Sequence, residues 1–389
     1  MIDLIVPPNW PTLRQWGAPR MHNRCVAVLG RADSPTDAVE DYCHYLASAL
    51  AAQGTSLTVA RVRWMEAGWA TALSEFTEKF PRQKNSWFLL QYTALAWSRR
   101  GFSWRFLKAL RHLKKSGARC AVVFHDADGY SGSRLVDRIR RAVQRHTMRD
   151  AARLADLSIF TIPPEKISWI TGPSQKTVFI PVGANLPSPE HAWQNEALKK
   201  ESVPAVAVFA ITGGAASTEE IKLIADAAIF ATKRIGPIRI VVLGRNSDIA
   251  RTRLLERLGA APVQVSVHGL LSADQVARLL VSCDVMLSVR GPISTRRGSA
   301  IAGIACGLPL IAIQGWETAP LLTEAGVVFV PPEESDNFGP ALVRVLADPP
   351  FRAQLAKRSR EAYVRYFSWD VIASQFSEAM RHCEAKPEL

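Results

Sequence analysis

The chain has 389 residues, of which 48% are hydrophobic and 21% are charged, and its formal net charge is +13. These values predict a folded chain of two or three domains and exclude a disordered protein. The longest nearly uncharged apolar run, residues 299–313, is broken by glycine and proline and is too short for a membrane-spanning helix.

Residues 1–24 are rich in proline and tryptophan, and we expect them to form an extended arm. They carry an acid and prolines where a secretory signal would be basic and then apolar, so we expect a cytoplasmic protein. Short apolar runs then alternate with helical stretches over residues 25–185, which predicts a parallel sheet covered on both faces. The expected strands are 25–29, 56–61, 87–91, 119–124, 157–161 and 177–180, and the expected helices include 39–53, 104–116 and 133–155.

The alternation stops in a loop rich in proline, asparagine and glycine at residues 181–187, and a polar stretch continues to residue 204. A second series then begins, with expected strands at 205–211, 238–243, 263–268, 285–288, 309–313 and 327–330. The sequence therefore predicts an α/β protein with two Rossmann-like, doubly wound parallel-sheet domains, over residues 25–185 and 204–367. Such sheets bind ligands at the carboxyl ends of their strands, so a pair of them makes a cleft.

The six cysteines lie far apart, without a C-x-x-C pair or a neighbouring histidine cluster. This spacing argues against a structural zinc site and against a disulfide framework. We expect reduced thiols that are mostly buried.

Positive charge is concentrated in residues 1–185, which hold 26 Lys and Arg against 14 Asp and Glu. The segment 99–115 has seven basic residues and no acid, and further arginines recur every three or four residues along the next expected helix. The interpretations are a solvated face or a surface for anionic lipid head groups, a lipid-diphosphate acceptor or an acidic glycan. Nucleic acid is disfavoured because stacking aromatics and base-reading motifs are missing. The recurring arginines are Arg134, Arg138, Arg141, Arg145, Arg149 and Arg153.

The most specific motifs lie in the second half. They are His268-Gly269-Leu270, then Gly291-Pro292-Ile293-Ser294-Thr295-Arg296-Arg297-Gly298-Ser299, and then Ala302-Gly303-Ile304-Ala305-Cys306-Gly307-Leu308-Pro309. This succession resembles the donor-binding domain of the family 4 glycosyltransferases, which have the GT-B fold. The resemblance covers about residues 205–377 and extends weakly to the first half, through Val39-Glu40-Asp41-Tyr42 and Val123-Phe124-His125-Asp126.

The resemblance implies a metal-independent transferase that moves a sugar, with retention, from a nucleotide diphosphate sugar to a glycan, lipid or small-molecule acceptor. It implies no cofactor, a donor domain at 204–367, an acceptor domain at 25–185, and a last helix at 368–389 that crosses back to the first domain. The acceptor would be anionic or lipid-linked, and the protein could bind peripherally to the inner membrane face.

The resemblance also places the site residues. The catalytic set would be His125, Arg296 and Arg297, and the acceptor side would include Asp37, Asp126, Arg134, Arg138 and Arg141. The donor would contact Gly213, Gly214, Arg245, His268, Gly269, Leu270, Ser294, Thr295, Gly298 and Ser299.

Three positions depart from the family pattern. Ser294 and Ala302 stand where the family has two glutamates, residues 212–217 lack its basic pair, and Asp37-Ala38 replaces a glycine pair. These departures keep a second hypothesis open, a GT-B protein that does not transfer, either a sugar epimerase or a silent binding subunit. In compensation, Ser294 or Ser299 would cap the following helix, and two arginines beside its N-terminus would bind phosphate.

A further alternative is a metal-dependent transferase. Asp126 and Asp128 form a D-x-D motif at the end of an apolar strand, which is how the GT-A architecture holds a divalent ion against a nucleotide diphosphate.

Overall fold

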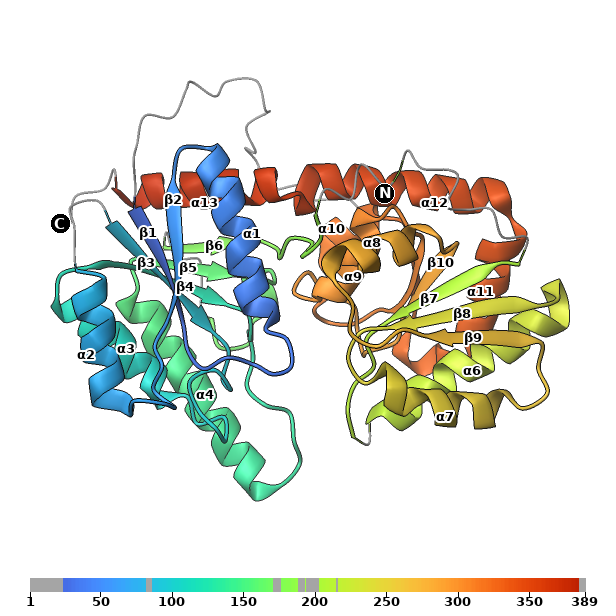
Figure 1. The fold of residues 1–389 in the computed structure, drawn as a ribbon, viewed down its shortest axis with the longest axis horizontal. Coiled ribbons are helices and arrows are strands. Elements are labelled where there is room, and N and C mark those ends of the chain that lie inside the picture. Colours follow the sequence, from blue (N-terminus) through green and yellow to red (C-terminus); the bar gives the residue numbers. More distant parts are fainter. Residues whose placement is uncertain are drawn as a thin grey trace.

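The computed structural model describes residues 24–81, 86–170, 176–187, 193, 203–214 and 216–384. The arm expected over residues 1–24 lies outside the described residues, except for Arg24 at its end. Two all-parallel sheets of six strands each, with helices around them, form two domains (Figure 1). The predicted fold class, α/β with two doubly wound parallel sheets, is confirmed.

The first sheet has the strand order β2-β1-β3-β4-β5-β6, and each neighbouring pair is parallel. Strands β3 and β4 are almost entirely buried, as expected for central strands with helices on both faces. The elements are β1 (Arg24–Leu29), α1 (Ala38–Ala52), β2 (Ser56–Arg61), α2 (Trp69–Lys79), β3 (Ser86–Tyr92), α3 (Trp104–Lys115), β4 (Arg119–Phe124), α4 (Leu135–Leu154), β5 (Leu157–Phe160), η1 (Pro164–Lys166) and β6 (Thr177–Phe179).

The second sheet has the order β12-β11-β10-β7-β8-β9 and is also parallel throughout. Its elements are β7 (Ala205–Phe209), α6 (Ala216–Ile235), β8 (Ile238–Leu243), α7 (Ser247–Leu258), β9 (Val263–Val267), α8 (Ala273–Val281), β10 (Val285–Ser288), α9 (Gly298–Ala305), β11 (Leu310–Ile313), α10 (Pro320–Glu324), β12 (Val327–Val330), η3 (Pro332–Asn337) and α11 (Phe338–Ala347). The described part of the chain ends with α12 (Pro349–Ala362), a π-helical turn η4 (Tyr363–Phe367) and α13 (Trp369–Glu384).

The last two long helices run along one side of both domains (Figure 1). Helix α13 packs against α1 of the first domain, where the Gln53 side-chain amide donates to the Asp370 carbonyl at 3.0 Å. At its far end, the Trp87 indole donates to Glu384 at 2.8 Å. Buried Leu46 and Phe376 belong to one hydrophobic cluster that continues into the second domain, so this helix joins the two domains.

The loop after β1 reaches the edge of the first sheet because Gly30 lies directly against the backbone of Ala96. A Cβ at this position would overlap the Ala96 carbonyl, which also accepts a hydrogen bond from the Arg31 amide at 2.8 Å. Glycine therefore allows the β1–α1 loop and the loop after β3 to pack together. Among the described helices, none is long and apolar enough to cross a membrane.

Candidate functional site

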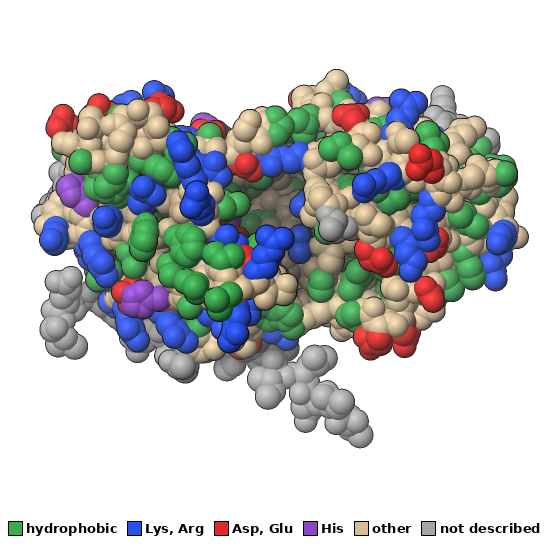
Figure 2. Space-filling view, turned by 90° about the horizontal axis from the view of Figure 1, so that it is seen from below, with side chains coloured by type: hydrophobic (Ala, Val, Ile, Leu, Met, Phe, Trp, Pro, Cys, Tyr) green, Lys and Arg blue, Asp and Glu red, His purple; other side chains and the backbone are tan. Residues whose placement is uncertain are grey.

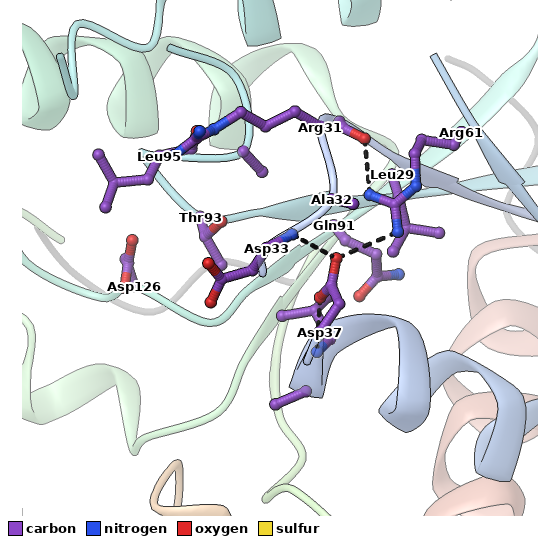
Figure 3. Close-up of a pocket in the computed structure, with 14 residues that line it drawn as sticks. Leu29, Arg31, Ala32, Asp33, Asp37, Arg61, Gln91, Thr93, Leu95 and Asp126 are labelled. Atoms are coloured by element: carbon purple, nitrogen blue, oxygen red, sulfur yellow. Dashed lines mark hydrogen bonds and ion pairs between the residues drawn. The ribbon is translucent and has the colours of Figure 1, made fainter. Parts of the chain in front are cut away.

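A cavity of about 250 Å³ opens at the carboxyl ends of β1, β3 and β4 in the first domain (Figure 3). This edge of a parallel sheet is where α/β proteins bind their ligands. The polar side chains that line it are Arg31, Asp33, Asp37, Arg61, Gln91, Thr93 and Asp126. Hydrogen-bond donors and acceptors therefore both face a cavity large enough for a small molecule.

Asp37 is the N-cap of α1. Its carboxylate accepts from the amides of Val39 and Glu40 at 3.1 and 3.2 Å, which satisfies two of the donors that a helix leaves free at its start. The Arg61 guanidinium donates to the same carboxylate at 3.1 Å and also pairs with Glu40. The free amides at the N-terminus of α1 could otherwise bind an anionic ligand, but here the Asp37 carboxylate accepts their hydrogen bonds.

His125 follows β4 at the same edge. Its Nε2 lies 2.9 Å from Gln91 Oε1, and its ring packs edge-on against Tyr42 with the ring centres 5.0 Å apart. Burial lowers the pKa of His125 to about 4. The imidazole is therefore neutral near pH 7, and we infer that the proton is on Nε2 because the glutamine oxygen only accepts.

Asp126 and Asp128 have separate partners. Asp126 lines the cavity and accepts from the Ala94 amide at 2.8 Å, and burial raises its pKa. Asp128 accepts two hydrogen bonds from Arg145, at 2.8 and 3.1 Å. Burial opposes its ionisation, but the bonds from Arg145 and the Gly129 amide outweigh burial and lower the pKa of Asp128. In the part of the chain that is described, no three His, Cys, Asp or Glu side chains gather as metal ligands.

On the second-domain side, Arg297 is the N-cap residue of α9. Its Nε is buried and has no hydrogen-bond partner among the described residues. Burial lowers the pKa of Arg297, and the charges of Arg296 and Arg290 lower it further. Arg290 follows β10, where its Nε donates to the Thr212 hydroxyl at 3.3 Å. Arginine stays charged even so, and the positive end of α9 adds to the same field.

Arg296 is engaged inside the chain. Its Nε and Nη2 each donate to the Glu317 carboxylate at 2.8 Å, so its planar fork is filled. Burial opposes the charge of Arg296, but Glu317 outweighs burial and raises its pKa, and Asp126 and Asp128 raise it further. Because these two aspartates belong to the first domain, the loop before α9 faces that domain.

The sequence did not indicate Glu317. Glu317 lies in the loop after β11, the strand that neighbours β10 in the sheet, and the residue is 8% exposed. Burial raises its pKa, but Arg296, Ser294 and Arg297 together lower it more. A carboxylate from a different loop thus lies near Ser294, where the family pattern has a glutamate. The only sequence signal was an acid shortly after the neighbouring strand.

The serines before α9 do not act as expected. Neither Ser294 nor Ser299 caps the helix, because Arg297 holds the N-cap position and Ser299 lies inside the first turn. Ser294 and Thr295 are fully buried, and the Thr295 hydroxyl donates to the Thr161 carbonyl of the first domain at 2.6 Å. The expected caps are therefore wrong, and Thr295 joins the two domains. Gly298 is the first residue of α9.

Ala302 lies within α9 and is 3% exposed. The other glutamate of the family pattern is therefore replaced by a small buried side chain, with no polar group of its own.

The remaining residues expected at the donor site lie on loops at the carboxyl edge of the second sheet. Gly213 and Gly214 precede α6, and Gly214 has a φ of 73°, which glycine adopts without strain. His268 is exposed, Gly269 accepts from the Gly244 amide at 2.7 Å, and Leu270 is 48% exposed.

Arg245, after β8, reaches across to the first domain instead. Its guanidinium donates to Asp33 at 2.9 Å and to the hydroxyl and carbonyl of Thr36. Because Asp33 also lines the cavity, this contact links the second domain to the cavity wall.

The three arginines expected on the acceptor side lie outside the cavity lined by Asp37 and Asp126. Arg134 is the N-cap residue of α4, and Arg138 and Arg141 border a shallow groove of about 380 Å³ along that helix. The acceptor-side residues of the prediction are therefore divided between an acidic cavity and a basic helix.

Two six-stranded parallel sheets that face each other across a cleft define the GT-B architecture. No family model and no curated protein matches the sequence closely enough to assign a family. Solved structures do match over nearly the whole chain. Sucrose-phosphate synthase from Thermosynechococcus elongatus matches 94% of this chain and 100% of its own, with a TM-score of 0.66 and 18% identity.

A glycosyltransferase from Rickettsia africae matches 94% of this chain and 100% of its own, with a TM-score of 0.63 and 13% identity. HepE from Anabaena, in complex with UDP and glucose, matches 92% of this chain and 100% of its own, with a TM-score of 0.61 and 14% identity. The chain therefore has the GT-B fold, as the sequence motifs predicted.

Proposed function

We propose that this protein is a glycosyltransferase that moves a sugar from a nucleotide diphosphate sugar to an acceptor in the first-domain cavity. The observation that carries the proposal is the buried, unpartnered Nε of Arg297 beside Arg290 at the N-terminus of α9. A buried guanidinium nitrogen without a partner is unfavourable by itself, so the site favours an anion such as a diphosphate. Related folds support the choice, since HepE has been solved with UDP-glucose.

In this proposal Arg297, Arg290 and the start of α9 bind the diphosphate and stabilise the charge that develops on it as the sugar leaves. Arg296 acts through Glu317 as a positioning residue, because its fork is already filled. The neutral His125 positions Gln91, which lines the cavity, and the cavity orients the acceptor hydroxyl. With retention, the leaving phosphate takes the acceptor proton, and the reaction needs neither a metal ion nor a cofactor.

The proposal also includes the location of the protein and the class of its acceptor. The protein would work in the cytoplasm on an anionic or lipid-linked acceptor, bound peripherally at the inner membrane face. The excess of basic residues in residues 1–185 supports such a partner.

The test is UDP and UDP-sugar binding by calorimetry. Arg297→Gln should weaken binding about 10- to 100-fold, since a charge-assisted hydrogen bond contributes roughly 1.5–3 kcal/mol. Arg251→Gln, an exposed arginine on α7 of the same domain, is the matched control and should bind like the wild type. Unchanged affinity in Arg297→Gln, or no binding of any nucleotide sugar by the wild type, would overturn the proposal.

A second candidate is a GT-B protein that does not transfer, such as a sugar epimerase or a binding subunit. The cap of Asp37 on α1 and the buried Ala302 favour it, because both replace groups that the family pattern uses. Incubation of the bound nucleotide sugar without acceptor, followed by chromatography, separates the two. A changed sugar on an intact nucleotide indicates the epimerase, whereas acceptor-dependent release of UDP indicates the transferase.

A further inference from the structure

Two segments far apart in the sequence meet on the outer face of the first domain. Phe102 and Trp104, at the start of α3, have ring centres 6.5 Å apart. The Arg140 guanidinium, from α4, lies 5.8 Å from the Phe102 ring and 4.9 Å from the ring of Tyr130. The loop before α4 and the first turns of α3 and α4 therefore form one continuous surface.

This surface exposes large apolar side chains. Of the twelve large hydrophobic side chains that are exposed in the described part of the chain, five lie here. They are Leu135 at 72%, Trp104 at 59%, Tyr130 at 52%, Ile139 at 52% and Val136 at 44% exposure, and we call them the docking face. Such clustering on a water-soluble surface marks an interaction site, whereas single exposed residues need no explanation.

Basic side chains border the docking face. Figure 2, which views the molecule from the side of α4, shows green side chains with blue ones around them on the first domain, beside the hollow between the domains. Arg138 is exposed between the apolar positions of α4, and Arg99 and Arg100 are exposed just before α3. The nearby acid, Asp137, is buried and paired with Arg140 at 2.7 Å.

The recurring arginines of α4 thus have different environments. Arg141 donates to the Tyr130 carbonyl at 2.8 Å and Arg145 holds Asp128, so both fasten the loop that presents Tyr130. Arg138 instead faces outward beside Ile139. Arg141 and Arg145 therefore stabilise the loop beneath the surface, and Arg138 contributes positive charge to it.

We propose that the docking face inserts into the interfacial region of an anionic lipid bilayer, with the bordering arginines on the head groups. Aliphatic and aromatic side chains interleaved with arginine suit a bilayer interface, where the apolar groups leave water and the cations meet phosphate. The loop that carries Tyr130 starts at Asp126, which lines the cavity. Resting on the proposed function, this orientation would bring a lipid-linked acceptor to the cleft.

The test is co-sedimentation of the full chain with vesicles of equal parts phosphatidylglycerol and phosphatidylcholine, compared with phosphatidylcholine alone. Leu135→Ser combined with Ile139→Ser should lower the partition coefficient at least about tenfold, since each side chain loses apolar burial. The matched control is Ile249→Ser combined with Leu255→Ser on α7, whose side chains are 66% and 45% exposed. Arg138→Gln should lower binding about fivefold at low salt and much less at high salt.

The experiment tests membrane binding, the assigned face and apolar insertion separately. No binding to anionic vesicles by the wild type overturns docking, and equal losses in the α4 and α7 variants overturn the assigned face. If the apolar variant binds like the wild type and high salt abolishes binding, insertion is wrong and only charge attraction remains. UDP binding, measured on the same preparations, should be unchanged in all variants. Vesicle binding without UDP binding would reject the proposed function and leave the docking face in place.

Discussion

Glu317→Gln should weaken the fold and, at the same time, tighten the binding of UDP. The Glu317 carboxylate is 8% exposed and accepts two hydrogen bonds of 2.8 Å from Arg296, whose side chain is 28% exposed. Glutamine would turn an amide donor toward a guanidinium donor. It would also remove the negative charge that offsets Arg296 and Arg297.

Loss of one partner of a buried ion pair costs roughly 3–5 kcal/mol. Because Arg296 keeps some solvent contact and glutamine keeps one acceptor oxygen, we expect a loss of about 2 kcal/mol in the free energy of unfolding. For the ligand, removing a negative charge beside a partly solvated anion site is worth on the order of 1 kcal/mol. UDP should therefore bind about fivefold more tightly.

The stability loss should depend on pH. The folded protein lowers the pKa of Glu317, so the wild type gains stability above the ordinary glutamate pKa of about 4.3 and loses it as the pH falls through the lowered value. The unfolding midpoints of wild type and Glu317→Gln in urea should differ at pH about 7, and the difference should shrink as the pH falls through the lowered pKa of Glu317. Glu333→Gln, an exposed glutamate in η3, is the control. An equal unfolding midpoint at neutral pH, or weaker UDP binding in calorimetry, would refute the reasoning.

The wild type should lose stability as the pH falls from about 6.5 to about 4, because the unfolded chain binds a proton at His125 that the buried imidazole does not bind. His125→Asn should not show this loss, and unfolding midpoints across the pH range measure the difference. Ala302→Glu should destabilise by about 2 kcal/mol or more, since it buries an unpaired carboxylate, and a gain in UDP affinity would contradict this. UDP-sugar binding should be equal in EDTA and in manganese, and unchanged in Asp128→Asn; a need for manganese would restore the metal-dependent alternative.

Strand positions could be predicted from the sequence because buried parallel strands are continuous apolar runs. The expected bounds 56–61, 119–124 and 285–288 agree with β2, β4 and β10. The run from Ala205 continues to Ile211, but β7 ends at Phe209 because Ala210 adopts a φ of 64° and turns the chain. Apolar composition predicts burial, whereas the backbone turn depends on tertiary contacts.

The site was predicted less completely, because its key pairs join residues from different loops. Arg296 and Arg297 are adjacent in the sequence and look equivalent, yet one meets Glu317 and the other has a buried Nε without a partner. Glu317 comes from the loop after a neighbouring strand, so motif spacing could not indicate the pairing. Likewise, the serine next to α9 looked like a cap, but the backbone gave that position to Arg297.

The charges of the cleft restrict how a ligand can lie in it. On the first-domain side the acids meet the chain's own groups, Asp37 at Arg61, Asp126 at the Ala94 amide and Asp33 at Arg245. Beside these carboxylates that wall suits hydroxyl groups, and Arg31 and Arg61 also line the cavity. The surplus positive charge lies opposite, at Arg297 and the start of α9. On the proposed function, a nucleotide diphosphate sugar would therefore lie with its diphosphate at the second domain and its sugar toward the first.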